Sequence, residues 1–195
     1  MHPSLKQNLF FIKEKVGMFK AANNFDIYNP DTQALSMTCR EDQLGIFTKI
    51  FRFTDYKRMT PFHIEIKSPV GEKVLTVKRG VSIFLSTVEV FDEKDNLVGR
   101  FKQKFFTIGG KFDILDLNEN IICTLQGKWT SWDFRFMRGN NELAQVSKKW
   151  AGLGKELFTT ADNYMLSINE TVAKEDNARI LILAAVMCID MILKE

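Results

Sequence analysis

The sequence has few of the residues on which enzyme active sites and metal centres usually depend. Its 2 histidines are His2 and His63, and its 3 cysteines are Cys39, Cys123 and Cys188, widely spaced and without a CxxC pair. A single internal histidine gives little support to a Ser-His or Cys-His nucleophilic site. The motifs GxSxG, GxGxxG, Walker A and HExxH are also missing. We therefore expect no catalytic residues and a protein that is not an enzyme.

Other scarce features narrow the class of protein further. Only 4 prolines and 11 glycines argue against a disordered chain. Lysines and arginines never form a run of five, so we expect no nucleic-acid partner, although the net charge of +3 permits an anionic one. The odd, scattered cysteines are typical of reduced thiols, and the first residues, MHPSLKQNLFFIKEK, lack the apolar core of a signal peptide. We expect a cytoplasmic protein.

What the sequence has in abundance is phenylalanine, with 17 copies, and short alternating runs separated by polar turns. In VEVFDEKDNLVGRF, Val88, Val90, Leu97 and Phe101 alternate with polar residues on either side of a turn at 92–96. This is the pattern of a β-hairpin, and it recurs about every 22 to 26 residues along the chain. The sequence therefore predicts an all-β protein. The N-terminal stretch could instead be an amphipathic membrane helix, but its repeat partner, described next, favours a strand.

A longer repeat lies over the hairpins and divides the chain into two similar β halves. Phe25-Asp26-Ile27 aligns with Phe112-Asp113-Ile114, and Lys13-Glu14-Lys15 aligns with Lys102-Gln103-Lys104. We place the first half at about 8–90 and the second at about 91–177 of a single domain covering 1–195. The two halves are expected to close on each other, because closure removes exposed strand edges.

The last stretch, ARILILAAVMCIDMILKE, predicts a helix over about 178–193 that is apolar nearly all round. Its 16 residues span about 24 Å, whereas a bilayer core of about 30 Å needs roughly 20 apolar residues. Asp190 would also cost about 2.5 kcal/mol or more inside a membrane. A membrane span is the alternative, but we expect a core helix, because the interior of a barrel of about a dozen strands is wide enough to hold one. The residues predicted to form its buried surface include Ile180, Leu183, Met187 and Met191.

The segment SKKWAGLGKELFTTADNYMLSI, followed by a helix ending in CIDMILKE, resembles the end of the phospholipid scramblase family. The matching features are Lys148-Lys149-Trp150, the run from Phe158 to Tyr164, and Ile189-Asp190. The wider group includes tubby-like C-terminal domains and LURP-one-related proteins. The resemblance implies a closed antiparallel barrel of twelve strands around a buried hydrophobic C-terminal helix, which agrees with the fold expected from the residues.

The resemblance also implies a site for anionic lipid headgroups. Tubby-like domains bind phosphoinositides through basic residues in a stretch that corresponds here to VGRFKQKFFTIGGKFDI. Arg100 and Lys102 take its first basic positions, Lys111 takes the later one, and Lys104 shares a strand face with the first two. Together these cations could bind phosphate oxygens. The alternative is that they form only the solvent-exposed face of a strand.

Calcium is the one ion that the resemblance suggests, and no other cofactor is expected. The segment proposed to bind calcium in scramblases corresponds to 160–171, where Asp162, Asn163 and Glu170 supply oxygen ligands. Its first and last positions are Thr160 and Thr171 rather than acids. We predict a non-catalytic domain that binds anionic phospholipid at the inner face of a membrane, with a link to lipid translocation suggested by the family. The alternative function is a protein-interaction or regulatory scaffold without lipid binding.

Overall fold

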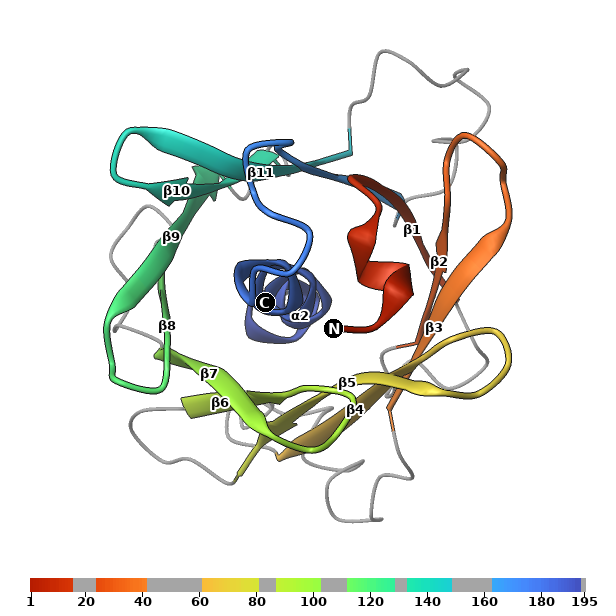
Figure 1. Cartoon of the computed structure of the whole chain (residues 1–195), viewed down its shortest axis with the longest axis horizontal. Coiled ribbons are helices and arrows are strands. Elements are labelled where there is room, and N and C mark those ends of the chain that lie inside the picture. Colours follow the sequence, from red (N-terminus) through yellow and green to blue (C-terminus); the bar gives the residue numbers. More distant parts are fainter. Residues whose placement is uncertain are drawn as a thin grey trace.

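Twelve antiparallel β-strands form a closed barrel around a single α-helix in this computed structural model (Figure 1). The structure describes residues 1–15, 24–41, 61–80, 87–102, 112–128, 133–148 and 163–193, without the side chains of residue 128 and of residues 189–193. The strands are β1 Leu9–Glu14, β2 Phe25–Tyr28, β3 Leu35–Glu41, β4 Phe62–Lys67, β5 Lys73–Arg79, β6 Thr87–Phe91, β7 Leu97–Lys102, β8 Phe112–Leu115, β9 Ile121–Lys128, β10 Asp133–Arg138, β11 Asn141–Ser147 and β12 Asn163–Ile168.

Each strand pairs with its neighbours in the sequence, and β1 pairs with β12 to close the barrel. In the closing pair, Phe10 lies opposite Leu166 and Ile12 lies opposite Tyr164. Closure leaves no strand edge with unpaired backbone groups, which is the physical advantage that favoured a barrel over an open sheet. The predicted all-β fold with twelve strands is confirmed.

The side chains of each strand alternate between the barrel interior and its outer surface. In β4, Phe62, Ile64 and Ile66 are buried, whereas His63 and Glu65 between them are partly exposed. This period of two places the branched and aromatic residues inside, where their burial drives folding. His63 therefore faces the opposite way from Phe62 and Ile64.

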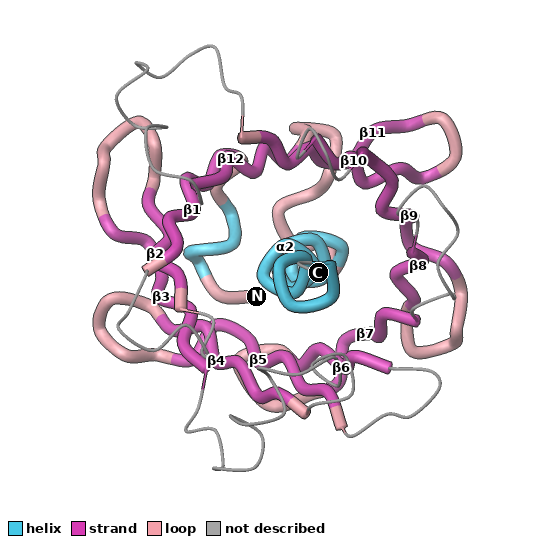
Figure 2. The backbone as a smooth tube through the Cα atoms, turned by 180° about the vertical axis from the view of Figure 1, so that it is seen from behind, coloured by secondary structure: helices cyan, strands magenta, loops and turns pink. Residues whose placement is uncertain are grey.

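The helix α2, Ala178–Leu193, fills the barrel (Figure 2). Residues 178–188 are all buried, and of the predicted core residues Ile180 is 2% exposed, Leu183 0% and Met187 1%. The side chain of Met191 lies outside the described residues. Burying each large apolar side chain contributes about 1.5–3 kcal/mol, so a helix that is apolar all round is stable only in such a place. The prediction of a core helix over a membrane span is confirmed.

The N-terminal segment enters the same interior beside the helix. A short 3₁₀ helix, η1 Pro3–Lys6, precedes β1 and buries Leu5. Arg179 in the first turn of α2 is 0% exposed, and its guanidinium donates hydrogen bonds to the carbonyl oxygens of Leu5, Val172 and Gln7 at 2.9, 3.0 and 2.5 Å. Arg179 therefore ties the start of the barrel to the helix. The strand predicted for the N-terminal stretch is present as β1.

The internal repeat of the sequence corresponds to strands that lie six positions apart. The aligned segments around Lys13 and Lys102 are the ends of β1 and β7, and the aligned Phe-Asp-Ile segments are on β2 and β8. In both copies the lysine lies directly across from the aspartate, since Lys13 pairs with Asp26 and Lys102 with Asp113. This is the relation that two similar halves of six strands require.

Candidate anion-binding surface

Two of the predicted headgroup residues, Arg100 and Lys102, fall on the outer surface of β7. Arg100 and Lys102 alternate with the buried Phe101, so both point away from the barrel interior on one strand face, as their spacing indicated. Lys104 and Lys111 lie outside the described residues. The structure thus brings together the two described members of the predicted set, and whether they bind a headgroup stays a prediction.

Each of these two cations has a carboxylate of the same chain beside it. Arg100 Nε lies 3.4 Å from Glu89 Oε1 on β6, and Lys102 Nζ lies 2.8 Å from Glu119 Oε1 in the turn before β9. The hydrogen bond from Lys102 and its charge lower the pKa of Glu119, so this carboxylate stays ionised. The face formed by Arg100 and Lys102 therefore carries little net charge.

The described calcium candidates do not come together. Asn163 begins β12 and is buried, whereas Glu170 is exposed just beyond the other end of that strand. Six strand residues separate the two positions by about 20 Å, so they cannot bind one ion. Asp162 lies outside the described residues. Within the described ranges, no three His, Cys, Asp or Glu side chains are grouped closely enough to hold a metal.

A second group of cations, which the sequence did not predict as a site, lies on the outer surface of β1 to β3. Lys15 Nζ lies 2.9 Å from one carboxylate oxygen of Asp26, and the guanidinium of Arg40 contacts the other oxygen. Lys13 is paired with Asp26 across the two strands and is exposed. We call Lys13, Lys15 and Arg40 the cationic cluster. It holds three positive charges around one carboxylate.

The central carboxylate of the cationic cluster stays ionised. Burial alone would raise the pKa of Asp26, but hydrogen bonds and charges from Arg40 and Lys15 outweigh it and lower the pKa below its usual value. Arg40 is anchored further by hydrogen bonds from its guanidinium to the carbonyl oxygens of Phe25 and Cys39, at 2.6 and 2.8 Å. Asp26 therefore holds Lys15 and Arg40 in place, and the three cations and this carboxylate together carry a net charge of about +2 at neutral pH.

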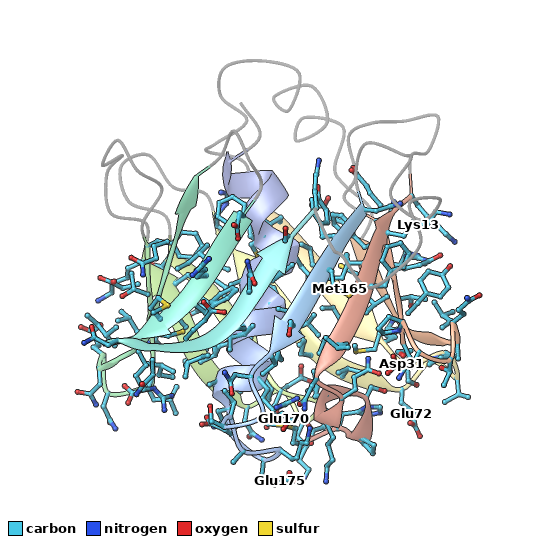
Figure 3. The ribbon with its side chains drawn as sticks, turned by 90° about the horizontal axis from the view of Figure 1, so that it is seen from above. Lys13, Asp31, Glu72, Met165, Glu170 and Glu175 are labelled. Atoms are coloured by element: carbon cyan, nitrogen blue, oxygen red, sulfur yellow. The ribbon has the colours of Figure 1, made fainter. Side chains whose placement is uncertain are left out.

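The opposite end of the barrel is acidic. The connections at this end are residues 1–8, 29–34, 68–72, 92–96, 116–120, 139–140 and 169–177. We call them the acidic rim, because they contain 10 aspartates and glutamates but only 3 lysines, a net charge of −7. Figure 3 shows Glu72, Glu170 and Glu175 at this end and Lys13 toward the other.

The turns of the acidic rim use their acids to shape the backbone. Asp92 accepts hydrogen bonds from the backbone amides of Lys94 and Asn96 at 2.9 and 2.8 Å, and Asp116 does the same for Asn118 and Asn120, both at 2.8 Å. Carboxylates that accept amide hydrogen bonds favour such turns. The acids of these hairpin turns therefore stabilise the turn conformations. Because several such turns lie at the same end of the barrel, their charges add up to a negative surface there.

The three cysteines do not form a reactive centre. Cys39 and Cys188 are 0% exposed and Cys123 is 1% exposed. Burial raises the pKa of Cys123 and Cys188 to about 12, and it raises the pKa of Cys39 further. The thiolate, which is the nucleophile, is therefore scarce in the folded protein at neutral pH.

We expect the native protein to react slowly with a thiol reagent such as DTNB at pH 8. All 3 cysteines should react quickly once the protein is unfolded in guanidinium chloride. The measurement is the absorbance of the released thionitrobenzoate in the two conditions. A thiol that reacts in the native protein as fast as in the unfolded one would contradict this expectation.

The fold is a twelve-stranded barrel closed around its own C-terminal helix. Among the described residues it has charged surfaces but no group of side chains that could hold a metal. These features can be compared with those of known families. The family model described as Scramblase matches residues 7–194, nearly the whole chain. The chain therefore belongs to the scramblase family and forms a scramblase-like domain.

Two curated proteins are among its relatives. The chain is 23% identical over 186 residues to a phospholipid scramblase family protein of Schizosaccharomyces pombe, covering 88% of this chain and 49% of the relative. It is 24% identical over 173 residues to phospholipid scramblase family member 5 of Homo sapiens, covering 80% of this chain and 62% of the relative. The chain thus spans about half to three fifths of the length of these relatives. No solved structure matches it.

One further property bears on how the chain could meet a membrane. Within the part of the chain that the structure describes, no helix combines the length and the apolar character needed to cross a bilayer.

Proposed function

We propose that this scramblase-family domain binds anionic phospholipid headgroups at a membrane surface, without catalysing a reaction. The observation that carries the proposal is the separation of charge along the barrel. The acidic rim has a net charge of −7, and the other residues that the structure describes contain 14 lysines and arginines against 9 acids, a net charge of +5. An anionic surface repels the first part and attracts the second, so the overall charge of +3 understates the electrostatic attraction.

The chemistry of the described surface also favours binding over a reaction. The charged groups of β1 to β3 and of β7 are lysines and arginines next to carboxylates, which suit contacts with phosphate oxygens. Each basic residue close to an anionic bilayer contributes about 1 kcal/mol of attraction. Since α2 and η1 occupy the barrel interior, the proposal concerns binding at the surface and not the passage of a lipid through the barrel.

We expect the protein to sediment with vesicles that contain phosphatidylserine at low ionic strength. It should stay in the supernatant with vesicles of phosphatidylcholine alone, because these have no net surface charge. Raising the salt from about 0.1 M to about 1 M shortens the Debye length from about 10 Å to about 3 Å, and binding should fall at least about tenfold. The measurement is the pelleted fraction against lipid concentration.

Equal binding to both kinds of vesicle, or binding that salt does not change, would rule out an electrostatic headgroup contact. If the protein pellets with neither kind of vesicle, the proposal fails. The alternative hypothesis, a protein-interaction scaffold that does not bind lipid, should then be tested.

A further inference from the structure

The internal repeat lets the two candidate cation sites be compared position by position. Lys102 on β7 corresponds to Lys13 on β1, and Asp113 on β8 corresponds to Asp26 on β2. The strand registers then place Gln126 where the first half has Arg40, because Phe25 pairs with Cys39 and Phe112 with Leu125. The second half therefore lacks the guanidinium that the first half holds at this point.

The lysines of the two halves also differ in their partners. Lys102 Nζ lies 2.8 Å from Glu119, whereas Lys13 has no ion-pair partner among the described residues. Asp26 is shared between Lys15 and Arg40, so it leaves Lys13 uncompensated. Among the outward-facing side chains, the cationic cluster has three cations for one carboxylate, whereas the predicted face of β7 has one carboxylate for each cation. Glu14 and Glu41 alternate with the cluster and lie on the inward-facing side of β1 and β3.

The cationic cluster and the acidic rim lie at opposite ends of the strands. Lys13 and Lys15 are at the end of β1 that is farthest from the N-terminal segment, and Arg40 is near the end of β3 that is farthest from the turn at 29–34. Both strands run away from the acidic rim. A barrel with these two ends has a preferred orientation over a negatively charged plane.

We propose that the domain docks on an anionic bilayer through the cationic cluster of Lys13, Lys15 and Arg40, with the acidic rim turned away from the lipid. This inference rests on the proposed function and adds a site and an orientation to it. Lys13 and the exposed parts of Lys15 and Arg40 contact lipid phosphates, while Asp26 holds the latter two side chains in place. The face formed by Arg100 and Lys102 contributes less, because Glu89 and Glu119 already neutralise it.

The first test removes the two lysines of the cluster. In Lys13→Gln/Lys15→Gln, the affinity for phosphatidylserine vesicles should fall about 25-fold, since each neutralised lysine near the surface accounts for about a fivefold change. Arg40 is kept so that Asp26 retains a partner. The matched control, Lys94→Gln/Lys174→Gln, removes the same charge from the acidic rim and should stay within about twofold of wild type. Lys102→Gln should also change binding only about twofold.

The second test measures how the domain is oriented on the membrane, in variants that keep all the charged residues of the wild-type protein. A cysteine is placed at Asn24, whose carbonyl accepts a hydrogen bond from the amide of Lys15 at 2.8 Å, or at Val70 in the acidic rim, which is 81% exposed. The native thiols are buried and do not compete for the label. An NBD fluorophore at position 24 should brighten and shift to the blue on phosphatidylserine vesicles, whereas the same fluorophore at position 70 should not respond.

The possible outcomes separate this inference from the proposed function. If wild type does not bind anionic vesicles at all, both fail. If wild type binds but the two double variants lose affinity equally, or if the fluorophore at position 70 responds as strongly as the one at position 24, the docking surface is wrong while headgroup binding stands. Loss of binding only in Lys13→Gln/Lys15→Gln, with a response only at position 24, supports the inference.

Discussion

Replacing Arg179 by leucine is expected to lower the free energy of unfolding by about 3–5 kcal/mol, because three buried carbonyl oxygens lose the group that donates hydrogen bonds to them. The arginine is 0% exposed, and its loss leaves the carbonyl oxygens of Leu5, Val172 and Gln7 without their donor. Each buried group left unsatisfied costs about 1–3 kcal/mol. The chain as a whole is stabilised by about 5–15 kcal/mol, so the variant should be partly unfolded at 37 °C.

Urea unfolding followed by tryptophan fluorescence and circular dichroism gives this quantity. Arg179→Lys should be intermediate, because an ammonium group has three donors on a single atom and cannot reproduce the planar fork of the guanidinium. Arg135→Leu is the matched control: this arginine is exposed and lies 3.4 Å from Glu142, so its loss should cost about 0–1 kcal/mol. If the free energy of unfolding of Arg179→Leu lies within about 1 kcal/mol of the wild-type value, as expected for the control, the N-terminal segment is held by other contacts.

Substituting alanine for Gly99 is expected to destabilise the fold by about 2–3 kcal/mol. A Cβ atom at this position would lie 2.3 Å from the carbonyl oxygen of Leu115 and 3.0 Å from a methyl group of Leu181 on α2. The backbone oxygen cannot move without disturbing the pairing of β7 with β8, and the leucine is enclosed by the core. Glycine at this position therefore lets the helix and the sheet approach each other closely.

Thermal unfolding of Gly99→Ala and Gly80→Ala measures this effect against a control. A Cβ at Gly80 meets nothing within 4 Å, so alanine there should change stability by no more than about 0.5 kcal/mol. Gly127 provides a second case, since a Cβ there would lie 2.2 Å from the carbonyl oxygen of Asp133. Equal melting temperatures for the variants at 99 and 80 would mean that β7 can move away from the helix at little cost.

The fold could be predicted from the sequence because its determinants are local. Alternating runs with polar turns define hairpins, and sixteen residues without a polar face define a helix that must be buried, as α2 Ala178–Leu193 is. The turns at 92–96 and 116–120 were also visible in the sequence, and an antiparallel barrel places alternate turns at one end. The acidic rim could therefore have been foreseen by adding up the charges of those turns.

The parts that escaped prediction depend on contacts between distant residues. In the sequence, Arg179 is only a charged residue at the start of the apolar run. Its hydrogen-bond acceptors, the carbonyl oxygens of Leu5 and Gln7, lie more than 170 residues earlier, so the sequence could not predict these bonds. The cationic cluster requires the register of β2 on β3, which brings Arg40 to Asp26, and alternation alone does not fix that register. The pairing of Lys102 with Glu119 likewise depends on the conformation of a turn.

The position of the helix in the sequence has a consequence for how the protein can be made. All twelve strands precede α2, and the closing pair joins β1 to β12, whose paired residues are about 155 positions apart. During synthesis the strands leave the ribosome before the helix that fills the space between them. The barrel can therefore not seal its last seam before β12 has emerged, and it cannot fill its interior before α2 has been made. Contacts this distant along the chain make folding slow. Until α2 is in place, the apolar inner face of the sheet is exposed and prone to aggregate with other chains.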